Sequence, residues 1–200
     1  MRTPVIRQFA LPVLLRLLMP LDVALREGLV RRYAAPIAIG TLVFVVDQAT
    51  KLLIRKTVDL HESIPVLDGF VDIVHARNPG AAFSFLADAP AWFRAPFFVG
   101  ISITAIVVLL YVIARLPLED RLMRIALGGV LGGALGNLLD RLMYGEVTDF
   151  VDLHWRSYHW PAFNVADSSI TLAVTAVIAQ ALFSGRSANT AREDGSEPST

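Results

Sequence analysis

Cysteine is absent from the 200-residue chain, which excludes disulfides, thiolate metal ligands and cysteine nucleophiles. Charge is also scarce: only 18% of the residues are charged, and the 18 basic residues balance the 18 acidic ones. This balance argues against a nucleic-acid partner, which would require an excess of basic side chains. The four histidines have no metal-binding spacing such as HExxH, so we expect no metal and no cofactor.

Apolar residues, in contrast, make up 54% of the chain, more than the roughly 45–50% of soluble domains. Four stretches approach the length of about 20 apolar residues that a helix needs to cross a bilayer. They are residues 35–54, 95–114, 125–143 and 165–184. A short loop containing Pro117 separates the second stretch from the third, so we expect these two helices to form an antiparallel hairpin.

Lysine and arginine indicate the orientation, because the cytoplasmic flanks of membrane helices carry an excess of both. Eleven of the 18 lie in residues 1–33, in the loop between the second and third spans, or in the C-terminal tail. The other seven lie on the opposite side or in its flanks. Both termini are therefore predicted to be cytoplasmic. Trp92, Trp155 and Trp160 fall on the opposite side, as expected for anchors at the membrane interface.

Composition divides the chain into three parts. Residues 1–33 are predicted to be a partly amphipathic, cytoplasmic N-terminal extension, because prolines and an arginine interrupt the apolar run that a signal peptide needs. Residues 34–185 form the predicted four-span membrane domain. Its outer segment, 55–93, contains the β-like runs SIPVLDGF and VDIVHARN and a turn-rich NPGAAFSFL, which predict a small extramembrane sheet. Residues 186–200 are small and polar, which predicts a disordered cytoplasmic tail.

Glycine is frequent in the third span. Gly128, Gly132 and Gly136 repeat every four residues, which predicts one helix face that lies close to another helix. Gly133 lies off this face and is a candidate for facing a site.

Polar residues interrupt the apolar pattern at two span ends. Asn137, Asp140 and Arg141 lie on neighbouring helical positions, as a functional cluster or as an Asp140–Arg141 pair that neutralises the helix terminus. In the second interpretation, Asn137 forms a hydrogen bond to another helix. Asp47 and Lys51 in the first span have the i, i+4 spacing of an ion pair, either structural or part of a site.

Two further acids, Asp149 and Asp167, lie beside the third and fourth spans. Their simplest roles are a solvated loop carboxylate for Asp149 and a helix cap for Asp167. Both spans end on the same face, however, so the two carboxylates can meet, and ionisable groups at membrane depth are candidates for function. One of two adjacent carboxylates retains its proton. Such a pair can activate water with one member and protonate a leaving group with the other.

Five blocks in this order, DQATK, NPGAAFSFL, GGALGNLLDRL, GEVTDFVD and FNVADSSI, closely resemble the signature blocks of the lipoprotein signal peptidase (signal peptidase II) family. The resemblance covers about residues 36–184. It implies an aspartic endopeptidase of the bacterial inner membrane that removes signal peptides from prolipoproteins, cutting just before a diacylglyceryl-modified cysteine. It also implies an active site near the periplasmic face and a β-cradle outside the membrane. The expected fold is thus a mainly α membrane protein with four transmembrane helices and a small β-sheet between the first two spans.

The resemblance also implies that Asp149 and Asp167 are the catalytic pair, and it leaves open which one is the base. The residues expected to support the site or bind substrate are Asp47, Lys51, Asn78, Gly133, Asn137, Asp140, Arg141 and Asn164. Lipidated prolipoproteins and membrane lipids are the expected partners, and we expect a monomer. The alternative is a non-enzymatic proton-coupled transporter or membrane scaffold, which the lack of an inverted repeat in the sequence disfavours.

Overall fold

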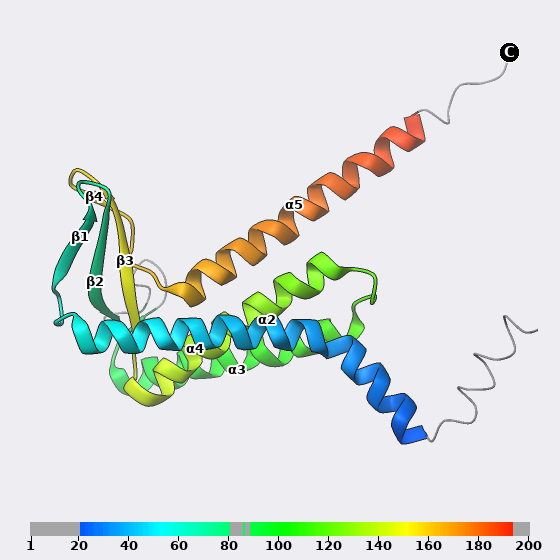
Figure 1. The fold of residues 1–200 in the computed structure, drawn as a ribbon, viewed down its shortest axis with the longest axis horizontal. Helices are drawn as coiled ribbons and strands as arrows, with labels where there is room; N and C mark the ends of the chain where they lie inside the picture. The colour runs from blue at the N-terminus through cyan, green and yellow to red at the C-terminus, as the bar shows by residue number, and fades with distance from the viewer. Residues whose placement is uncertain (1–20, 81–85, 87–88, 194–200) are drawn as a thin grey trace, which may run out of the picture.

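The computed structural model describes residues 21–80, 86 and 89–193. Within these residues, four helices are long and apolar enough to cross a membrane, at Gly28–Thr57, Trp92–Arg115, Arg121–Tyr144 and Val165–Phe183. The prediction of four spans is therefore confirmed. In chain order the elements are α2 (Leu21–Thr57), β1 (Ser63–Leu67), β2 (Val71–Asn78), α3 (Ala91–Arg115), α4 (Arg121–Tyr144), β3 (Val147–Trp155), β4 (Tyr158–His159) and α5 (Val165–Glu193) (Figure 1).

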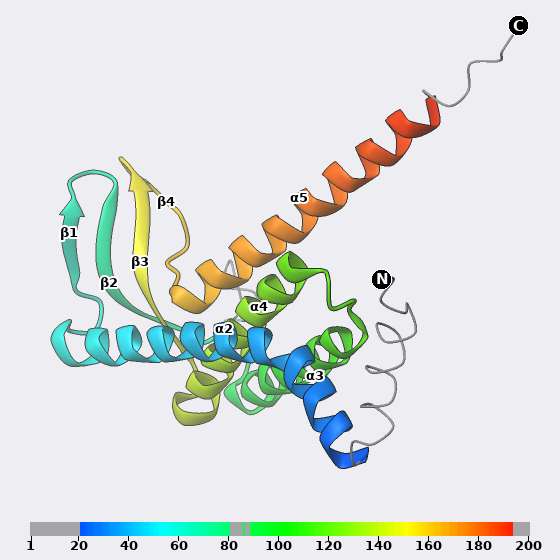
Figure 2. The same ribbon diagram turned by 45° about the vertical axis from the view of Figure 1, so that its right-hand side comes forward.

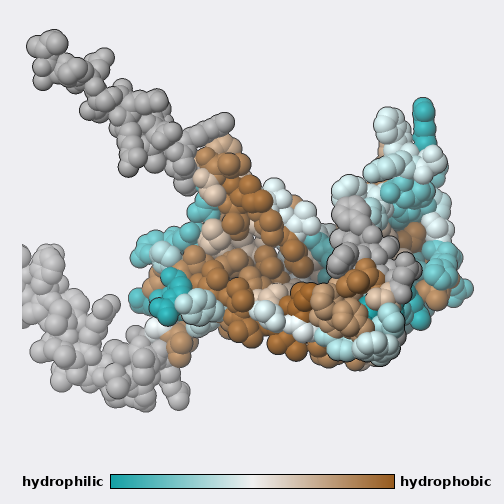
Figure 3. Space-filling model, turned by 180° about the vertical axis from the view of Figure 1, so that it is seen from behind, coloured by the Kyte–Doolittle hydropathy of each residue, from teal (hydrophilic) through white to brown (hydrophobic). Residues whose placement is uncertain are grey.

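The outer surface of the helices is apolar. Leu42 and Leu53 of α2, Val107 of α3 and Leu172 of α5 are all at least half exposed, which suits side chains that face lipid. Figure 3 shows the result on one face of the molecule: hydrophobic side chains cover the helices, and hydrophilic ones cover the end that carries the sheet. The sheet therefore lies outside the apolar band, as predicted.

Close contact between α2 and α4 depends on the predicted glycine face. A Cβ atom on Gly128 would lie 2.6 Å from the carbonyl oxygen of Pro36, so only glycine fits there. Gly132 lies in the same way against the backbone of Gly40. Pro36 lies inside α2, and the helix bends in its N-terminal part (Figure 1), as expected where proline removes a backbone hydrogen bond. The prediction of a close helix contact is confirmed, and α2 is the partner.

The two ends of the membrane domain differ from the predicted boundaries. Because α2 begins at Leu21, it continues through the predicted boundary at residues 33/34, while residues 1–20 lie outside the described part. At the other end, α5 continues to Glu193, into the segment 186–200 for which the sequence predicts disorder. Ala188 and Ala191 favour a helix there, and no proline stops it. Residues 194–200 lie outside the described part. Figures 1 and 2 both show the C-terminal half of α5 leaving the other helices.

The sheet has four antiparallel strands in the order β1-β2-β3-β4. β2 coincides with the predicted run VDIVHARN, and the chain turns into it through Gly69, whose φ of 78° favours glycine. β3 lies outside residues 55–93, where the sequence predicts the sheet, and its polar residues are also typical of a loop. β3 follows directly after α4 and pairs with β2, with Asp149 opposite Ala76 and Val147 opposite Asn78. This pairing brings Asn78 beside Asp149.

Candidate active site

Asp149 is held in the sheet by two amide donors. Asn78 Nδ2 donates to its Oδ2 over 3.0 Å, and Asn164 Nδ2 donates to its Oδ1 over 2.7 Å. The residue is only 2% exposed, so the alternative role of a solvated loop carboxylate does not hold. Burial, together with the negative charge of Asp167, raises the pKa of Asp149 to about 7. This carboxyl group therefore exchanges its proton near neutral pH.

Asp167 lies in the first turn of α5 and takes part in a capping box. Asn164 is the capping residue, whose Oδ1 accepts from the backbone N–H of Asp167 over 2.9 Å. In return, Asp167 Oδ2 accepts from the backbone N–H of Asn164 over 3.2 Å. The other carboxylate oxygen, Oδ1, accepts from Asn137 Nδ2 of α4 over 2.8 Å. Asp167 thus helps to cap the helix and also presents its carboxylate toward α4 and β3.

Both carboxylates line one cavity of about 910 Å³ between the sheet and the ends of α4 and α5. Asn78, Asn137 and Arg141 share this lining with them. The rest of the wall is largely apolar and is formed mainly by Ala76, Pro79, Val147, Leu153, Trp160, Pro161, Ala162, Phe163, Ile170 and Leu172. A polar floor with apolar walls suits a peptide bond flanked by apolar groups.

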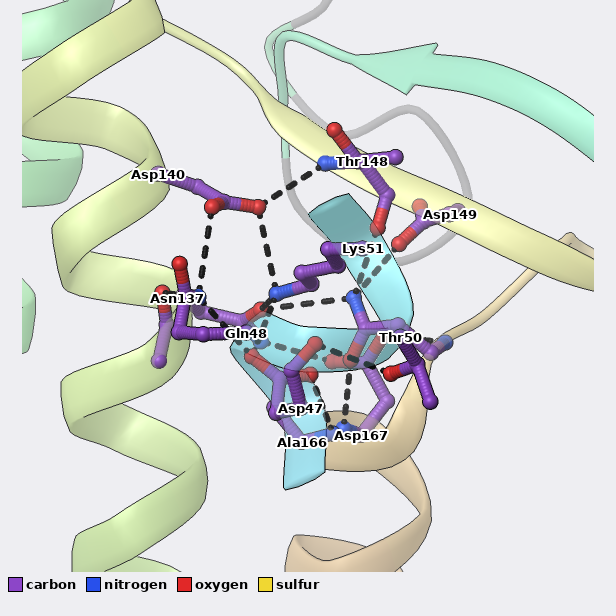
Figure 4. Close-up of polar contacts among 12 residues, drawn as sticks. Asp47, Gln48, Thr50, Lys51, Asn137, Asp140, Thr148, Asp149, Ala166 and Asp167 are labelled. Carbon is purple, nitrogen blue, oxygen red and sulfur yellow. Dashed lines mark hydrogen bonds and ion pairs between the residues drawn. The ribbon is translucent and has the colours of Figure 1, made fainter. Parts of the chain in front are cut away.

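A buried ion cluster lies close to Asn137, Asp149 and Asp167, which line the cavity (Figure 4). Lys51 Nζ lies 2.9 Å from Asp47 Oδ2 and 3.1 Å from Asp140 Oδ2, and all three side chains are 0% exposed. Arg55 adds a second cation, 2.8 Å from Asp140 Oδ1. The cluster holds two cations and two anions, and its backbone partners are the N–H groups of Ala166 and Thr148. It therefore ties α2, α4, β3 and the start of α5 together.

Arg141 contacts the turn after β2 and the helix α3. Its Nη2 donates to the carbonyl oxygen of Gly80 over 3.2 Å, and its guanidinium lies over the ring of Phe98. Of the two interpretations of this cluster, the Asp140–Arg141 pair at the helix terminus does not hold, because adjacent residues on a helix point in different directions. Asp140 turns to Lys51 and Arg55, while Arg141 turns to the cavity and the turn after β2.

The structure brings most of the predicted residues together. The predicted Asp47–Lys51 pair is confirmed, and Asn164 connects Asp149 to Asp167. Gly133 is the exception, because it lies against the carbonyl oxygen of Ala166 and the side chain of Ile170, so its role is packing against α5.

Three residues at the site are not among the predicted ones: Arg55, which the sequence indicates only as a flanking charge, Gln48 and Thr148. Arg55 Nε donates to Thr148 Oγ1 over 2.9 Å, and Gln48 Nε2 donates to Asp47 Oδ2 over 3.1 Å. The signal for Arg55 was its position four residues after Lys51, which continues the same helical face.

Comparisons with known proteins show which family the sequence resembles. The profile of the family described as "Signal peptidase (SPase) II" matches residues 39–183. The "Lipoprotein signal peptidase" of Geobacter sulfurreducens is 51% identical over 138 residues, covering 69% of this chain and 84% of the relative. That of Syntrophus aciditrophicus is 48% identical over 133 residues, covering 66% of this chain and 83% of the relative.

Solved structures show the same fold. One described as "Bacterial membrane enzyme structure by the in meso method at 2.3 A resolution" matches with a TM-score of 0.65 and 32% identity, covering 84% of this chain and 94% of that chain. A second, described in the same words at 1.9 A resolution, matches with a TM-score of 0.64 and 33% identity, covering 74% of this chain and 93% of the other.

Proposed function

This chain belongs to the signal peptidase II family, and from that premise we propose that Asp149 and Asp167 are its catalytic pair. The protein is an aspartic peptidase that removes signal peptides from prolipoproteins, and it is a multi-pass bacterial membrane protein. The observation that carries the proposal for the pair is their shared cavity: the buried carboxyl group of Asp149 on β3 and the half-buried one of Asp167 on α5 line it together with amide donors.

The proposed reaction uses one ionised and one protonated carboxyl group. The ionised group takes a proton from a water molecule while the water oxygen attacks the scissile carbonyl carbon. The protonated group gives its proton to the carbonyl oxygen, which produces a tetrahedral diol. The C–N bond then breaks, the amide nitrogen takes the proton that came from water, and the diol returns the other proton. Both carboxyl groups end in their starting states.

We place the cut just before the diacylglyceryl-modified cysteine, in a cavity at the periplasmic face of the inner membrane. The position of the cavity supports this, because it lies where the sheet meets the outer ends of α4 and α5. Its apolar walls, including Leu153, Ile170 and Leu172, suit a substrate that is anchored in lipid. Asn78 and Arg141 offer N–H groups to the substrate backbone. Both termini are proposed to be cytoplasmic and the protein monomeric.

The direct test is cleavage by the purified protein. The wild type is incubated in detergent with a diacylglyceryl-modified prolipoprotein and, in parallel, with the same precursor without the lipid. Release of the signal peptide from the lipidated precursor alone is the expected result. Equal cleavage of both precursors would contradict the proposed substrate, and cleavage of neither would contradict the proposed function.

A further inference from the structure

The amide of Asn137 has only one orientation that its neighbours accept. Lys51 Nζ lies 2.8 Å from Asn137 Oδ1, and an ammonium group can only donate. Asn164 Nδ2 donates to the same oxygen over 3.3 Å. The amide nitrogen must therefore point to the opposite side, where it donates to Asp167 Oδ1 over 2.8 Å. A carboxylate that accepts an N–H is favoured in its ionised form.

The ammonium of Lys51 has the partners that a buried charge requires. Asp47 and Asp140 lie within ion-pair distance of Nζ, and Arg55 balances the second negative charge. A buried cation with matched anions is expensive to break, so it is a rigid anchor for whatever it contacts. Its remaining contact is Asn137, which connects the ion cluster to the proposed catalytic pair.

We propose that Lys51 is a positioning residue that fixes Asn137 as a hydrogen-bond donor and thereby holds Asp167 as the ionised, water-activating member of the pair. The inference rests on the proposed function and adds which carboxyl group carries the proton at the start of the reaction: Asp149 is protonated and Asp167 is ionised. Without the ammonium, only the longer 3.3 Å hydrogen bond from Asn164 Nδ2 holds the Asn137 oxygen, so the amide can rotate and present Oδ1 to Asp167. Two facing acceptors repel unless a proton lies between them, so Asp167 would then retain a proton and lose its role as base.

The surroundings of Asp149 agree with this order. Asn78 and Asn164 both donate to it, which favours its ionised form, but burial and the charge of Asp167 outweigh them and leave its pKa at about 7. The charged groups that face Asp167 come from three elements: Asp149 on β3, Arg141 on α4, and Asp47 and Lys51 on α2. Of these groups, Lys51 is the one bonded to the amide that reaches Asp167.

Two charge-balanced double variants separate this role from general support of the ion cluster. Lys51→Met with Asp47→Asn removes one cation and one anion and leaves Arg55 paired with Asp140. Arg55→Met with Asp47→Asn removes the same charges and leaves Lys51 on Asn137, so it is the matched control. The dependence of kcat/KM on pH is measured for both and for the wild type, with a lipidated prolipoprotein in detergent.

We expect the acidic limb of the rate profile to move to higher pH in the Lys51 variant, by about one unit, which is a ~10-fold loss of kcat/KM on that limb. The limb of the Arg55 control should stay near that of the wild type. An unmoved limb in a folded Lys51 variant, or equal shifts in both double variants, would overturn the proposal.

A third variant keeps the test decisive if the Lys51 variant does not fold. Asn137→Leu leaves the ion pairs in place and removes the amide, so its acidic limb must move in the same direction. An unmoved limb there overturns the role of the Lys51–Asn137 contact. Wild-type activity in Asp149→Asn or Asp167→Asn would instead contradict the proposed catalytic pair. Failure of the role of Lys51 and failure of the proposed function are therefore distinguishable.

Discussion

Replacing Asp149 with asparagine should change how the stability of the folded protein depends on pH. Burial, together with the charge of Asp167, raises the pKa of Asp149 to about 7, against about 3.9 in an unfolded chain. The folded protein therefore retains a proton where the unfolded chain has lost it. This group contributes stability below about pH 4, and the contribution is lost as the pH rises to about 7.

The size of the effect follows from the shift. About three pKa units correspond to about 4 kcal/mol, so the wild type should lose about that much more stability than Asp149→Asn between about pH 4 and pH 8. For a chain of this length, that is a change of about 8–16 °C in the difference between the two Tm values. The Asp167→Asn variant should lose less stability than the wild type over this pH range. The substitution removes one cause of the raised pKa of Asp149, the charge of Asp167, and leaves the other, its burial.

The assay is thermal unfolding in detergent at closely spaced pH values. Asp68→Asn, in the exposed turn between β1 and β2, controls for the loss of one carboxylate. A Tm difference between wild type and Asp149→Asn that stays constant from about pH 4 to pH 8 would refute the reasoning. A Tm of the wild type that rises relative to that of Asp149→Asn as the pH increases would refute it as well.

Other changes test the remaining parts of the fold. Asp140→Asn removes a buried anion that pairs with the buried Lys51 and the half-buried Arg55, so it should cost about 3–5 kcal/mol in thermal stability; a normally stable variant would contradict its structural role. Gly132→Ala places a Cβ 2.9 Å from Gly40 Cα and should cost about 1–3 kcal/mol, whereas Gly100→Ala, which meets open space, should not; equal Tm values would contradict close packing of α2 and α4. Reporter fusions at residue 75 and at the C-terminus should lie on opposite sides of the membrane, and matching locations would refute the proposed topology.

Features that depend on local pattern were predictable from the sequence. The four spans follow from runs of apolar residues, and the close contact of α4 with another helix follows from Gly128 and Gly132 on one helix face, although not that α2 is the partner. The Asp47–Lys51 pair follows from the helical period. In each case the information lies within a few residues of the chain, so the sequence alone indicates it.

Features that depend on distant partners were not predictable in the same way. Residues 147–155 form the strand β3 because they pair with β2, some 70 residues earlier in the chain. The polar residues of β3 are as typical of a loop as of a strand. Asp140 forms ion pairs with Lys51 and Arg55, more than 80 residues away in the chain, and not with its neighbour Arg141. Asn164, in contrast, lies three residues before Asp167, yet its second role at Asp149 required the fold.

The most direct test of the proposed catalytic pair is the rate of signal-peptide release by Asp149→Asn, Asp167→Asn and the double variant, measured beside their thermal stability. Asparagine can still accept the backbone N–H of Asn164, so Asp167→Asn should keep its capping box and fold normally. Each single variant should lose at least ~10²–10⁴-fold in rate. The double variant should be barely worse, because the two groups act as a unit. A normally stable Asp167→Asn protein that still cleaves a lipidated prolipoprotein at the wild-type rate would show that Asp167 is a helix cap and contradict the catalytic pair.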